Sequence, residues 1–351
     1  MPKERVHAGG AARRTAGAVI LLAVSALALS RAAAAPHAGI RITDNLYDTR
    51  FITADDGWAV GAFGTIVRTR DGGDSWRPQV SHTVENLFGV DFVDAQHGWI
   101  VGRSGMILHT NDGGDTWETQ PTGIDRHLFK VKALDPQRAW VVGDWGTMLA
   151  THDGGKTWEN RTLDRDIILN GEAWPDGQHG WVVGEGGTIL VTSDGGTTWS
   201  DQKSGVEKSL YGVNFPDLQH GWAVGIDGLI LRTADGGQTW QLQHGNTEVG
   251  ALDQVGVAEA FGNPSLYDVA VAGTYGYAVG DIGAVFFSGD GGSTWQRKEM
   301  PGEWSLRWIR SVSLVSGTHG AFVGANGLVG RVVKDEVRLP EKKEHAPETT
   351  D

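Results

Sequence analysis

Short apolar runs recur along this chain at a fixed interval. One run reads GWIVG at residues 98–102, and variants of it begin at residues 57, 139, 180, 221, 276 and 320. A second run precedes each copy, as at residues 87–92 (LFGVDF). Apolar runs of this length between glycine-rich turns predict β-strands. Most copies are 41 residues apart, and a period in this range predicts a repeat architecture.

A turn phrase, [ST]-x-D-G-G-x-[ST]-W, repeats in step with these strands. Its aspartate can accept hydrogen bonds from the backbone amides that follow, and its glycines can adopt positive φ. Its tryptophan can bury a large ring against neighbouring strands. Six equal copies predict a structural role in closing hairpins, not a catalytic or metal-binding one. The aspartates are Asp71, Asp112, Asp153, Asp194, Asp235 and Asp290.

Together the phrases define seven units of about 42 residues, enough for one four-stranded propeller blade each. In the second unit we expect strands at residues 87–92, 98–101, 106–110 and 117–120. The fold class predicted is all-β, a seven-bladed β-propeller over residues 36–333. The units are expected to start near residues 46, 87, 128, 169, 210, 266 and 306.

Closure of the ring needs a further strand, because the seventh unit has no clear fourth strand after Val333 and an open sheet edge is left unpaired. Residues 39–43 (GIRIT) have strand character and are predicted to supply it. Residues 334–339 are the competing candidate. The charged, proline-containing residues 334–351 are otherwise predicted to be a disordered tail.

Residues 1–35 are typical of an export signal, with Lys and Arg near the start, an apolar core at 16–29 and small residues at 32–35. The apolar core is shorter than the roughly 20 residues that span a bilayer. We therefore expect cleavage, no transmembrane helix in the mature chain, and a soluble protein in the periplasm or an equivalent extracytoplasmic space. The chain has no Cys, so it must be stable there without disulfides.

The formal net charge of the chain is −13, which argues against nucleic-acid binding. The motifs HExxH, GxSxG and GxxxxGK[ST] are absent from the sequence. We therefore predict no catalytic residue, no cofactor and no metal site.

The first strand of each unit should line the central channel of a propeller. Alternation predicts that Leu87, Gly89 and Asp91 face the channel. It predicts that Phe88, Val90 and Phe92 pack against the neighbouring blade. The equivalent positions carry charges of both signs, which either neutralise one another or bind a polar ligand or a partner's side chain. The expected channel residues include Asp48, Arg50, Asp91, Lys130, Lys132, Asp268, Trp308 and Arg310.

Two sets of loops should share one face, and loops on a rigid scaffold commonly carry binding residues. One set joins the second and third strands, and the other joins blade to blade. Trp145 stands where other units have Ser104, Gly186, Asp227 or Ile282, which suggests a contact surface. The insertion at residues 245–263 is either a lid or partner contact or a tolerated surface excursion. Further candidate partner-binding residues on this face are Arg103, Arg126, Arg165 and Arg307.

The D-G-G-x-T-W turn is the Asp-box, and its pairing with GWxVG at each step closely resembles the photosystem II stability/assembly factor family. The resemblance covers residues 45–333. It implies a non-enzymatic, extracytoplasmic propeller that binds assembly intermediates of a membrane complex, namely the precursor of a reaction-centre subunit. Photosynthetic members carry an arginine patch, for which Arg103, Arg126, Arg165, Arg307 and Arg310 are the candidates here. The export signal indicates a bacterial member.

Three alternatives stay open. Sialidases share the Asp-box, and residues 40–43 half match their F-R-I-P start. A glycosidase would need paired carboxylates such as Asp144 with Glu185. A carbohydrate-binding propeller and a periplasmic accessory protein of an exporter are the other two.

Overall fold

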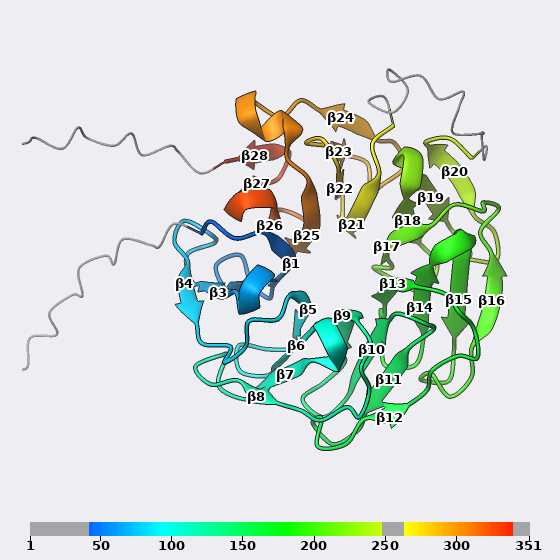
Figure 1. Ribbon diagram of the computed structural model, residues 1–351. Helices are drawn as coiled ribbons and strands as arrows, with labels where there is room; N and C mark the ends of the chain where they lie inside the picture. The colour runs from blue at the N-terminus through cyan, green and yellow to red at the C-terminus, as the bar shows by residue number, and fades with distance from the viewer. Residues whose placement is uncertain (1–41, 248–262, 340–351) are drawn as a thin grey trace, which may run out of the picture. The chain divides into compact units, whose positions relative to one another are not determined.

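The computed structural model describes residues 42–247 and 263–339. The chain divides into two compact units, Met1–His37 and Ala38–Asp351, and every described residue belongs to the second. Within it the strands form seven antiparallel sheets of four consecutive strands. The innermost strands of neighbouring sheets pack together, and that of the last sheet packs on that of the first (Figure 1). The prediction of an all-β, seven-bladed propeller is confirmed.

Blades are numbered in chain order, and each runs from the central channel outward. The innermost strands are β1 Leu46–Phe51, β5 Leu87–Phe92, β9 Leu128–Ala133, β13 Leu169–Ala173, β17 Leu210–Asn214, β21 Leu266–Ala272 and β25 Ile309–Val315. The second strands are β2 Gly57–Gly61, β6 Gly98–Gly102, β10 Ala139–Gly143, β14 Gly180–Gly184, β18 Gly221–Gly225, β22 Tyr275–Gly280 and β26 His319–Gly324.

The third strands are β3 Ile66–Thr69, β7 Ile107–Thr110, β11 Met148–Thr151, β15 Thr188–Thr192, β19 Ile230–Thr233, β23 Val285–Ser288 and β27 Val329–Val333. The outermost strands are β4 Arg77–Gln79, β8 Glu118–Thr119, β12 Glu159–Asn160, β16 Ser200–Lys203, β20 Gln241–His244, β24 Gln296–Lys298 and β28 Glu336–Arg338. Short 3-10 turns are η1 Ala62–Gly64, η2 Arg103–Gly105, η3 Glu185–Gly187, η4 Ile226–Gly228, η5 Gly302–Leu306 and η6 Ala325–Gly327.

Each innermost strand contains a β-bulge near its start. In blade 2 the pairing of β5 with β6 skips Phe88, and the same register shift occurs in the other six sheets. A bulge adds one residue and so changes the side to which its neighbours point. The predicted alternation is therefore wrong at its first two positions. Leu87 is buried between blades, whereas Phe88 contacts Tyr47 and Phe129 on the neighbouring innermost strands.

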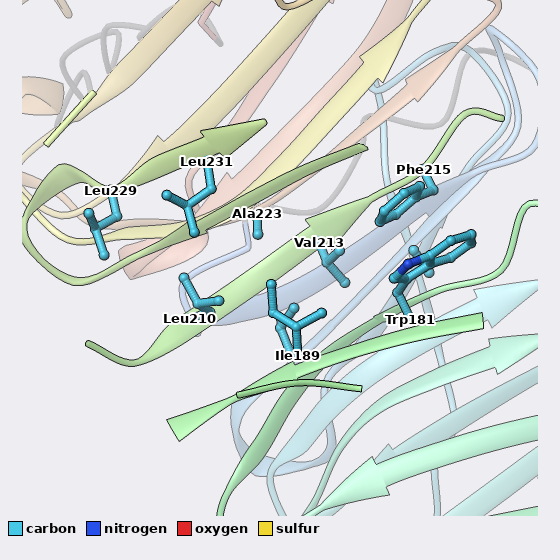
Figure 2. Close-up of a cluster of buried hydrophobic side chains, with 10 residues drawn as sticks. Trp181, Ile189, Leu210, Val213, Phe215, Ala223, Leu229 and Leu231 are labelled. Carbon is cyan, nitrogen blue, oxygen red and sulfur yellow. The ribbon is translucent and has the colours of Figure 1, made fainter. Parts of the chain in front are cut away.

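The apolar core lies between adjacent blades. Figure 2 shows the cluster between blades 4 and 5, where Trp181 stacks on Phe215 with ring centroids 3.8 Å apart. In blade 2, Val90 and Phe92 enter the equivalent cluster, as the sequence predicted. One such cluster lies at each of the seven blade boundaries. Burial of apolar surface on both sides of every sheet is therefore what holds the ring together.

The Asp-box turn joins the third strand of a blade to its fourth. One carboxylate oxygen of Asp153 accepts the hydroxyl of Thr151 and the amide of Thr157, and the other accepts the hydroxyl of Thr157. The hydrogen bonds from Thr157 lower the pKa of Asp153 to about 2. The carboxylate oxygens are thus used inside the turn. The same arrangement recurs at Asp71, Asp112, Asp194, Asp235 and Asp290.

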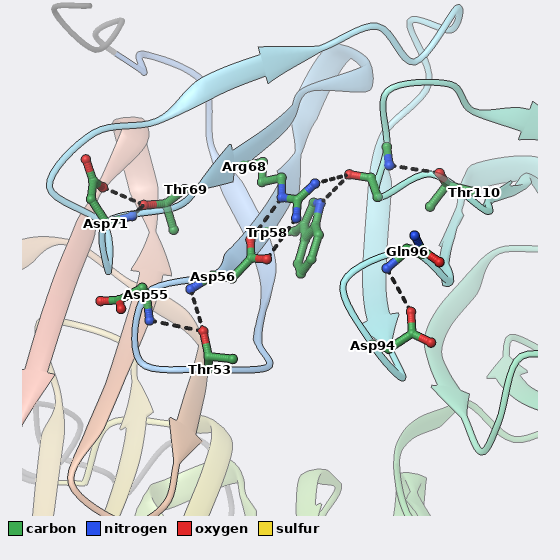
Figure 3. A network of polar contacts seen from close by, with 12 residues as sticks. Thr53, Asp55, Asp56, Trp58, Arg68, Thr69, Asp71, Asp94, Gln96 and Thr110 are labelled. Carbon is green, nitrogen blue, oxygen red and sulfur yellow. Dashed lines mark hydrogen bonds and ion pairs between the residues drawn. The ribbon is translucent and has the colours of Figure 1, made fainter. Parts of the chain in front are cut away.

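A second set of polar contacts ties Asp-box turns to the preceding blade. In Figure 3 the guanidinium of Arg68 lies between the carboxylate of Asp56, at 2.8 Å, and the carbonyl oxygen of Gly113, at 3.0 Å. Trp58 donates its indole N–H to the same carbonyl, 3.1 Å away. Equivalent indole bonds run from Trp181 to Gly236 and from Trp222 to Gly292. In these blades the tryptophan of the GWxVG run therefore bridges two blades.

The seventh blade takes its outermost strand from the C-terminal side. β28 pairs with β27 after a two-residue turn at Lys334 and Asp335, where Lys334 has a φ of +57°, as tight hairpins require. The prediction that residues 39–43 supply this strand is wrong: Ile42 and Thr43 lie outside any strand, and the other three lie outside the described residues. The propeller thus extends past 333, into the predicted tail.

The seventh unit also begins later than predicted. Leu306 is the last residue of η5 and is 77% exposed, whereas Ile309 is fully buried. Ile309 pairs with Gly324 as Leu46 pairs with Gly61. Ser311 and Ser313 therefore occupy the channel positions that the sequence analysis gave to Trp308 and Arg310. The predicted starts of the other six units agree with the structure.

Three predictions fall partly or wholly outside the described residues: the signal at 1–35, most of the insertion at 245–263, and the tail beyond 339. Within residues 42–247 and 263–339, no helix has the length and apolar character needed to span a bilayer.

Candidate functional site

The central channel is a polar cavity of about 250 Å³ lined by the innermost strands of all seven blades. The β-bulge near the start of each innermost strand determines which of its residues face this cavity. The charged residues of the lining are Asp48, Arg50, Asp91, Lys130, Lys132, Glu172 and Asp268. Six of these seven were predicted from the sequence.

Polar side chains of the channel satisfy backbone donors of the next blade. The amide of Val90 donates to Asp48 at 3.0 Å, and the amide of Ala133 donates to Asp91 at 2.9 Å. A buried amide without a partner is destabilising, so these side chains have a structural task at the blade boundaries. Equivalent bonds run from Val271 to Asn214, from Val312 to Asp268 and from Phe51 to Ser313.

The channel cations are paired with these carboxylates. Lys130 lies 2.8 Å from Asp48. Lys132 and Arg50 lie 2.7 and 2.9 Å from the two oxygens of Asp91. Burial alone would raise the pKa of Asp91, but Arg50 and Lys132 outweigh it and hold the pKa below its usual value. The geometry thus favours mutual neutralisation over a free ligand site.

Glu172 is the charged channel residue that was not predicted from the sequence. It occupies the strand position that holds Val90, Val131 or Val213 in other blades. One oxygen accepts the indole N–H of Trp174 at 2.9 Å, and the other is buried with no hydrogen-bond partner among the described residues. Burial raises the pKa of Glu172 to about 8, against the opposing effects of Trp174 and Lys132. At neutral pH the carboxyl is therefore largely protonated.

The variant Glu172→Gln is expected to be more stable than the wild type at pH 9, by at least about 2 kcal/mol, and to come close to it at pH 5. A raised carboxyl pKa means that the native state binds the proton more tightly. Stability is then greatest below the unfolded pKa of 4.5 and falls as pH rises to about 8. Urea unfolding across this range measures the difference. The exposed Glu159→Gln is the control, and a pH-independent difference for Glu172→Gln would contradict the assignment.

The loops between second and third strands lie at the end of the channel where the innermost strands begin, since Leu46 pairs with Gly61. Most of the candidate arginines lie at this end, but the structure does not gather them into one cluster. Arg103 is 3.8 Å from Glu85, and Arg165 forms a two-bonded pair with Asp201.

The other candidates rest on aromatic rings. Arg126 donates to the carbonyl of Trp145 at 3.1 Å, with its guanidinium 6.0 Å from the ring centroid. The structure thus brings Arg126 and Trp145 together. Arg307 lies 4.5 Å from the ring centroid of Trp304. Arg310 lies 4.3 Å from the ring centroid of Tyr267, outside the channel lining where it was predicted.

A strip of half-buried aromatic residues follows part of the channel rim. Trp308 stacks on Tyr47 at 6.0 Å, Tyr47 meets Phe88 at 5.7 Å, and Phe88 meets Phe129 at 5.7 Å. His127 contacts both Phe88 and Phe129. We call these five residues the aromatic sector; they come from blades 7, 1, 2 and 3. Regular strand alternation does not predict this sector, because the β-bulge changes the side to which these residues point. The signal was present, since an aromatic residue follows the first leucine in five units.

Large apolar side chains also occupy strained positions beside this sector. Phe63 and Trp145 have φ of +54° and +56° in their turns and are 73% and 56% exposed. Ile282 has a φ of +52°, and Gly186 fills the equivalent place in blade 4. The left-handed region costs a non-glycine residue about 1–2 kcal/mol. Phe63 and Trp145 therefore expose large apolar side chains at this face, in turns whose backbone favours glycine.

Four overlapping segments of the chain match one family model, "Photosynthesis system II assembly factor YCF48": residues 31–123, 79–167, 120–203 and 201–302. None of the curated proteins compared with the chain matches it.

Solved structures support the fold. A YCF48 bound to D1 peptide is 24% identical with a TM-score of 0.66, covering 85% of this chain and 94% of that one. YCF48 from Cyanidioschyzon merolae is 21% identical with a TM-score of 0.63, covering 84% and 97%. The GH74 xyloglucanase from Xanthomonas campestris is 13% identical with a TM-score of 0.66, covering 86% of this chain and 55% of that one.

An enzyme thus shares the architecture, so the fold alone does not decide the activity. Family membership is shown by the family model instead, because its matched segments span most of the chain. The chain belongs to the YCF48 photosystem II assembly factor family of seven-bladed propellers.

Proposed function

We propose that this protein is an exported, non-enzymatic scaffold that binds a protein partner, namely a subunit or assembly intermediate of a membrane complex. The observation that carries the proposal is membership of an assembly-factor family in which a YCF48 has been solved with a D1 peptide bound. The signal-like residues 1–35 support export, and the propeller would then act outside the cytoplasm.

The binding face that we propose is the loop face at the start of the innermost strands. There Arg126 and Arg310 rest on aromatic rings, and neither has an ion-pair partner among residues 42–247 and 263–339. Arg103, Arg307 and Trp145 belong to the same face, with Trp145 in the turn between β10 and β11. The channel residues Arg50, Lys130 and Lys132 are proposed to stabilise the ring instead of binding a partner.

Charge reversal at the loop face tests the proposal. The double variant Arg126→Glu/Arg310→Glu should recover at least about tenfold less partner than the wild type in cross-linked extracytoplasmic extracts, with subunits identified by mass spectrometry. Arg77→Glu, on the exposed outer strand β4, is the matched control and should recover as much as the wild type. Equal recovery by the double variant and the wild type would rule out this face.

The glycosidase alternative is tested in parallel. Release of sugar from a panel of glycans by the purified protein, abolished in Asp144→Asn, would replace the scaffold proposal with a hydrolase.

A further inference from the structure

Two carboxyl groups of the channel meet at one hydroxyl group. Ser311 lies on β25 of blade 7, which packs between β21 of blade 6 and β1 of blade 1 (Figure 1). Its Oγ is 2.6 Å from Oδ1 of Asp48 and 2.9 Å from Oδ2 of Asp268. A serine hydroxyl has one hydrogen, so it can donate to only one of two ionised carboxylates. The second short contact therefore needs a proton on one of the carboxyl groups.

The other partners of the two carboxyl groups indicate where that proton lies. Oδ1 of Asp48 also accepts the ammonium group of Lys130 at 2.8 Å, whereas Oδ2 of Asp268 accepts the neutral amide of Val312 at 3.0 Å. A cation favours the ionised form of the carboxyl beside it, so Asp268 is the better proton carrier. Its O–H would donate to Ser311, whose own hydroxyl would donate to Asp48. All three groups would then be satisfied.

The amide that Asp268 accepts does not require a carboxyl group. Asp268 accepts the amide of Val312 in blade 7 at 3.0 Å, and Asn214 accepts the amide of Val271 in blade 6 at the same distance. A neutral side chain thus suffices for this task. A carboxyl group at position 268 has a second state that an asparagine lacks, because it can gain and lose a proton.

Charges from the surrounding strands set the direction of the titration. Burial raises the pKa of Asp268, Lys130 on β9 opposes the rise, and Asp48 on β1 adds to it. Arg310 on β25 and Glu172 on β13 also interact with Lys130. The other channel charges form ion pairs, of Asp91 with Arg50 and Lys132. A raised carboxyl pKa contributes stability below the unfolded pKa, and that contribution is lost as pH rises through the native pKa. The site therefore fills as pH falls.

From this geometry we infer that Asp268, Ser311 and Asp48 share one proton that joins blade 7 to blades 6 and 1, and that release of this proton loosens β25. The proton passes to solvent water as pH rises. Ser311 can then donate to one carboxylate only, and the two carboxylates repel each other across it. This pH-sensitive junction belongs to the ring itself, so it goes beyond the proposed partner binding and does not depend on it.

Carbon-13 NMR of the aspartate carboxyl carbons, followed from about pH 4 to about pH 9, tests the shared proton. In the wild type, Asp268 should titrate at higher pH than Asp91. Asp91 is the matched reference, because it is a buried channel carboxyl whose pKa Arg50 and Lys132 hold below its usual value. Titration of Asp268 at or below the pH at which Asp91 titrates would overturn the inference.

The variant Ser311→Ala separates a shared proton from burial alone. If the proton is shared, the variant removes the acceptor of the Asp268 O–H, and the proton affinity of Asp268 should fall at least about threefold. If Ser311 only donates to an ionised Asp268, its loss should raise that affinity. Ser313→Ala is the control, because it removes a hydroxyl of β25 that accepts the amide of Phe51, and it should change the affinity less than about twofold. An unchanged or higher affinity in Ser311→Ala, or an equal fall in both variants, would overturn the inference.

Amide hydrogen exchange in the wild type tests the loosening of β25 without any substitution. The amide of Phe51 in blade 1 donates to Ser313 of β25, and the amide of Val271 in blade 6 donates to Asn214 in blade 5, both at 3.0 Å. Exchange at both amides accelerates with pH, but the ratio of the Phe51 rate to the Val271 rate should rise at least about threefold as Asp268 loses its proton. A constant ratio would show that the proton does not control this blade boundary, which would overturn the inference.

Discussion

Replacing Trp58 with alanine is expected to lower the free energy of unfolding by about 3–5 kcal/mol. Trp58 is fully buried, and its ring stacks on Phe92 of the next blade with centroids 3.7 Å apart. The guanidinium of Arg68 lies 4.3 Å from the ring centroid. Alanine would leave a cavity at the boundary of blades 1 and 2 and remove the indole bond to Gly113. Urea unfolding followed by far-ultraviolet circular dichroism measures the loss.

The control is Trp145→Ala. Trp145 is the same residue type in a turn at the loop face and is 56% exposed. Its removal should change the free energy of unfolding by no more than about 0.5–1 kcal/mol. If both variants lost a similar free energy of unfolding, burial of Trp58 at the blade boundary would not explain its effect on stability.

The second large effect is expected from Lys130→Met, which should lower the free energy of unfolding by about 2–4 kcal/mol at pH 7.5. Lys130 lies 2.8 Å from Asp48, and Ser311 bridges Asp48 to Asp268. Burial alone would lower the pKa of Lys130, but the two carboxylates outweigh it and raise the pKa. Without the ammonium group, two buried carboxyls would share one site with no cation beside them.

The sign of the pH dependence follows from the carboxyls. Burial already raises the pKa of Asp268, and loss of Lys130 would raise it further. A carboxyl whose pKa is raised in the native state stabilises the fold at pH values below its unfolded-state pKa. That contribution is lost as the pH rises through the native-state pKa. The deficit of Lys130→Met should therefore be small near pH 4 and large at pH 7.5.

Two further variants check this account. Asp48→Asn combined with Lys130→Met should recover part of the deficit, because it removes one of the two uncompensated charges. Arg161→Ala, which breaks an exposed pair with Glu159, should cost less than about 1 kcal/mol. A deficit of Lys130→Met that is equal at pH 4 and pH 7.5 would show that electrostatics is not its cause.

Much of the fold could be predicted because each blade repeats the same local chemistry. The GWxVG run, the Asp-box turn and the leucine that opens each unit placed the strands of blade 2 within one or two residues. Prediction failed where one unit departs from the others. Blade 7 lacks an Asp-box, so β28 had no sequence marker, and Leu306 resembled a unit start although Ile309 makes the pairing.

The channel and the loop face were harder to predict for a different reason. Alternation along a strand assumes regular pairing, and one unrecognised bulge moved Phe88 and its equivalents to the rim. Glu172 was not predicted because the same strand position is apolar in other blades, as at Val90, Val131 and Val213. Whether Arg50 or Lys130 is free or paired depends on side chains from other blades, and a single sequence does not give those distances.

The composition of the seventh sheet has a consequence for how such rings can change in evolution. Since β25 to β28 are consecutive, as in every other sheet, each blade is one uninterrupted stretch of the sequence. Duplication or deletion of such a stretch would leave all remaining sheets whole, because none in the described part of the chain joins strands from both ends. The number of blades could then change by one complete blade at a time, and only the angle between neighbouring blades would have to change.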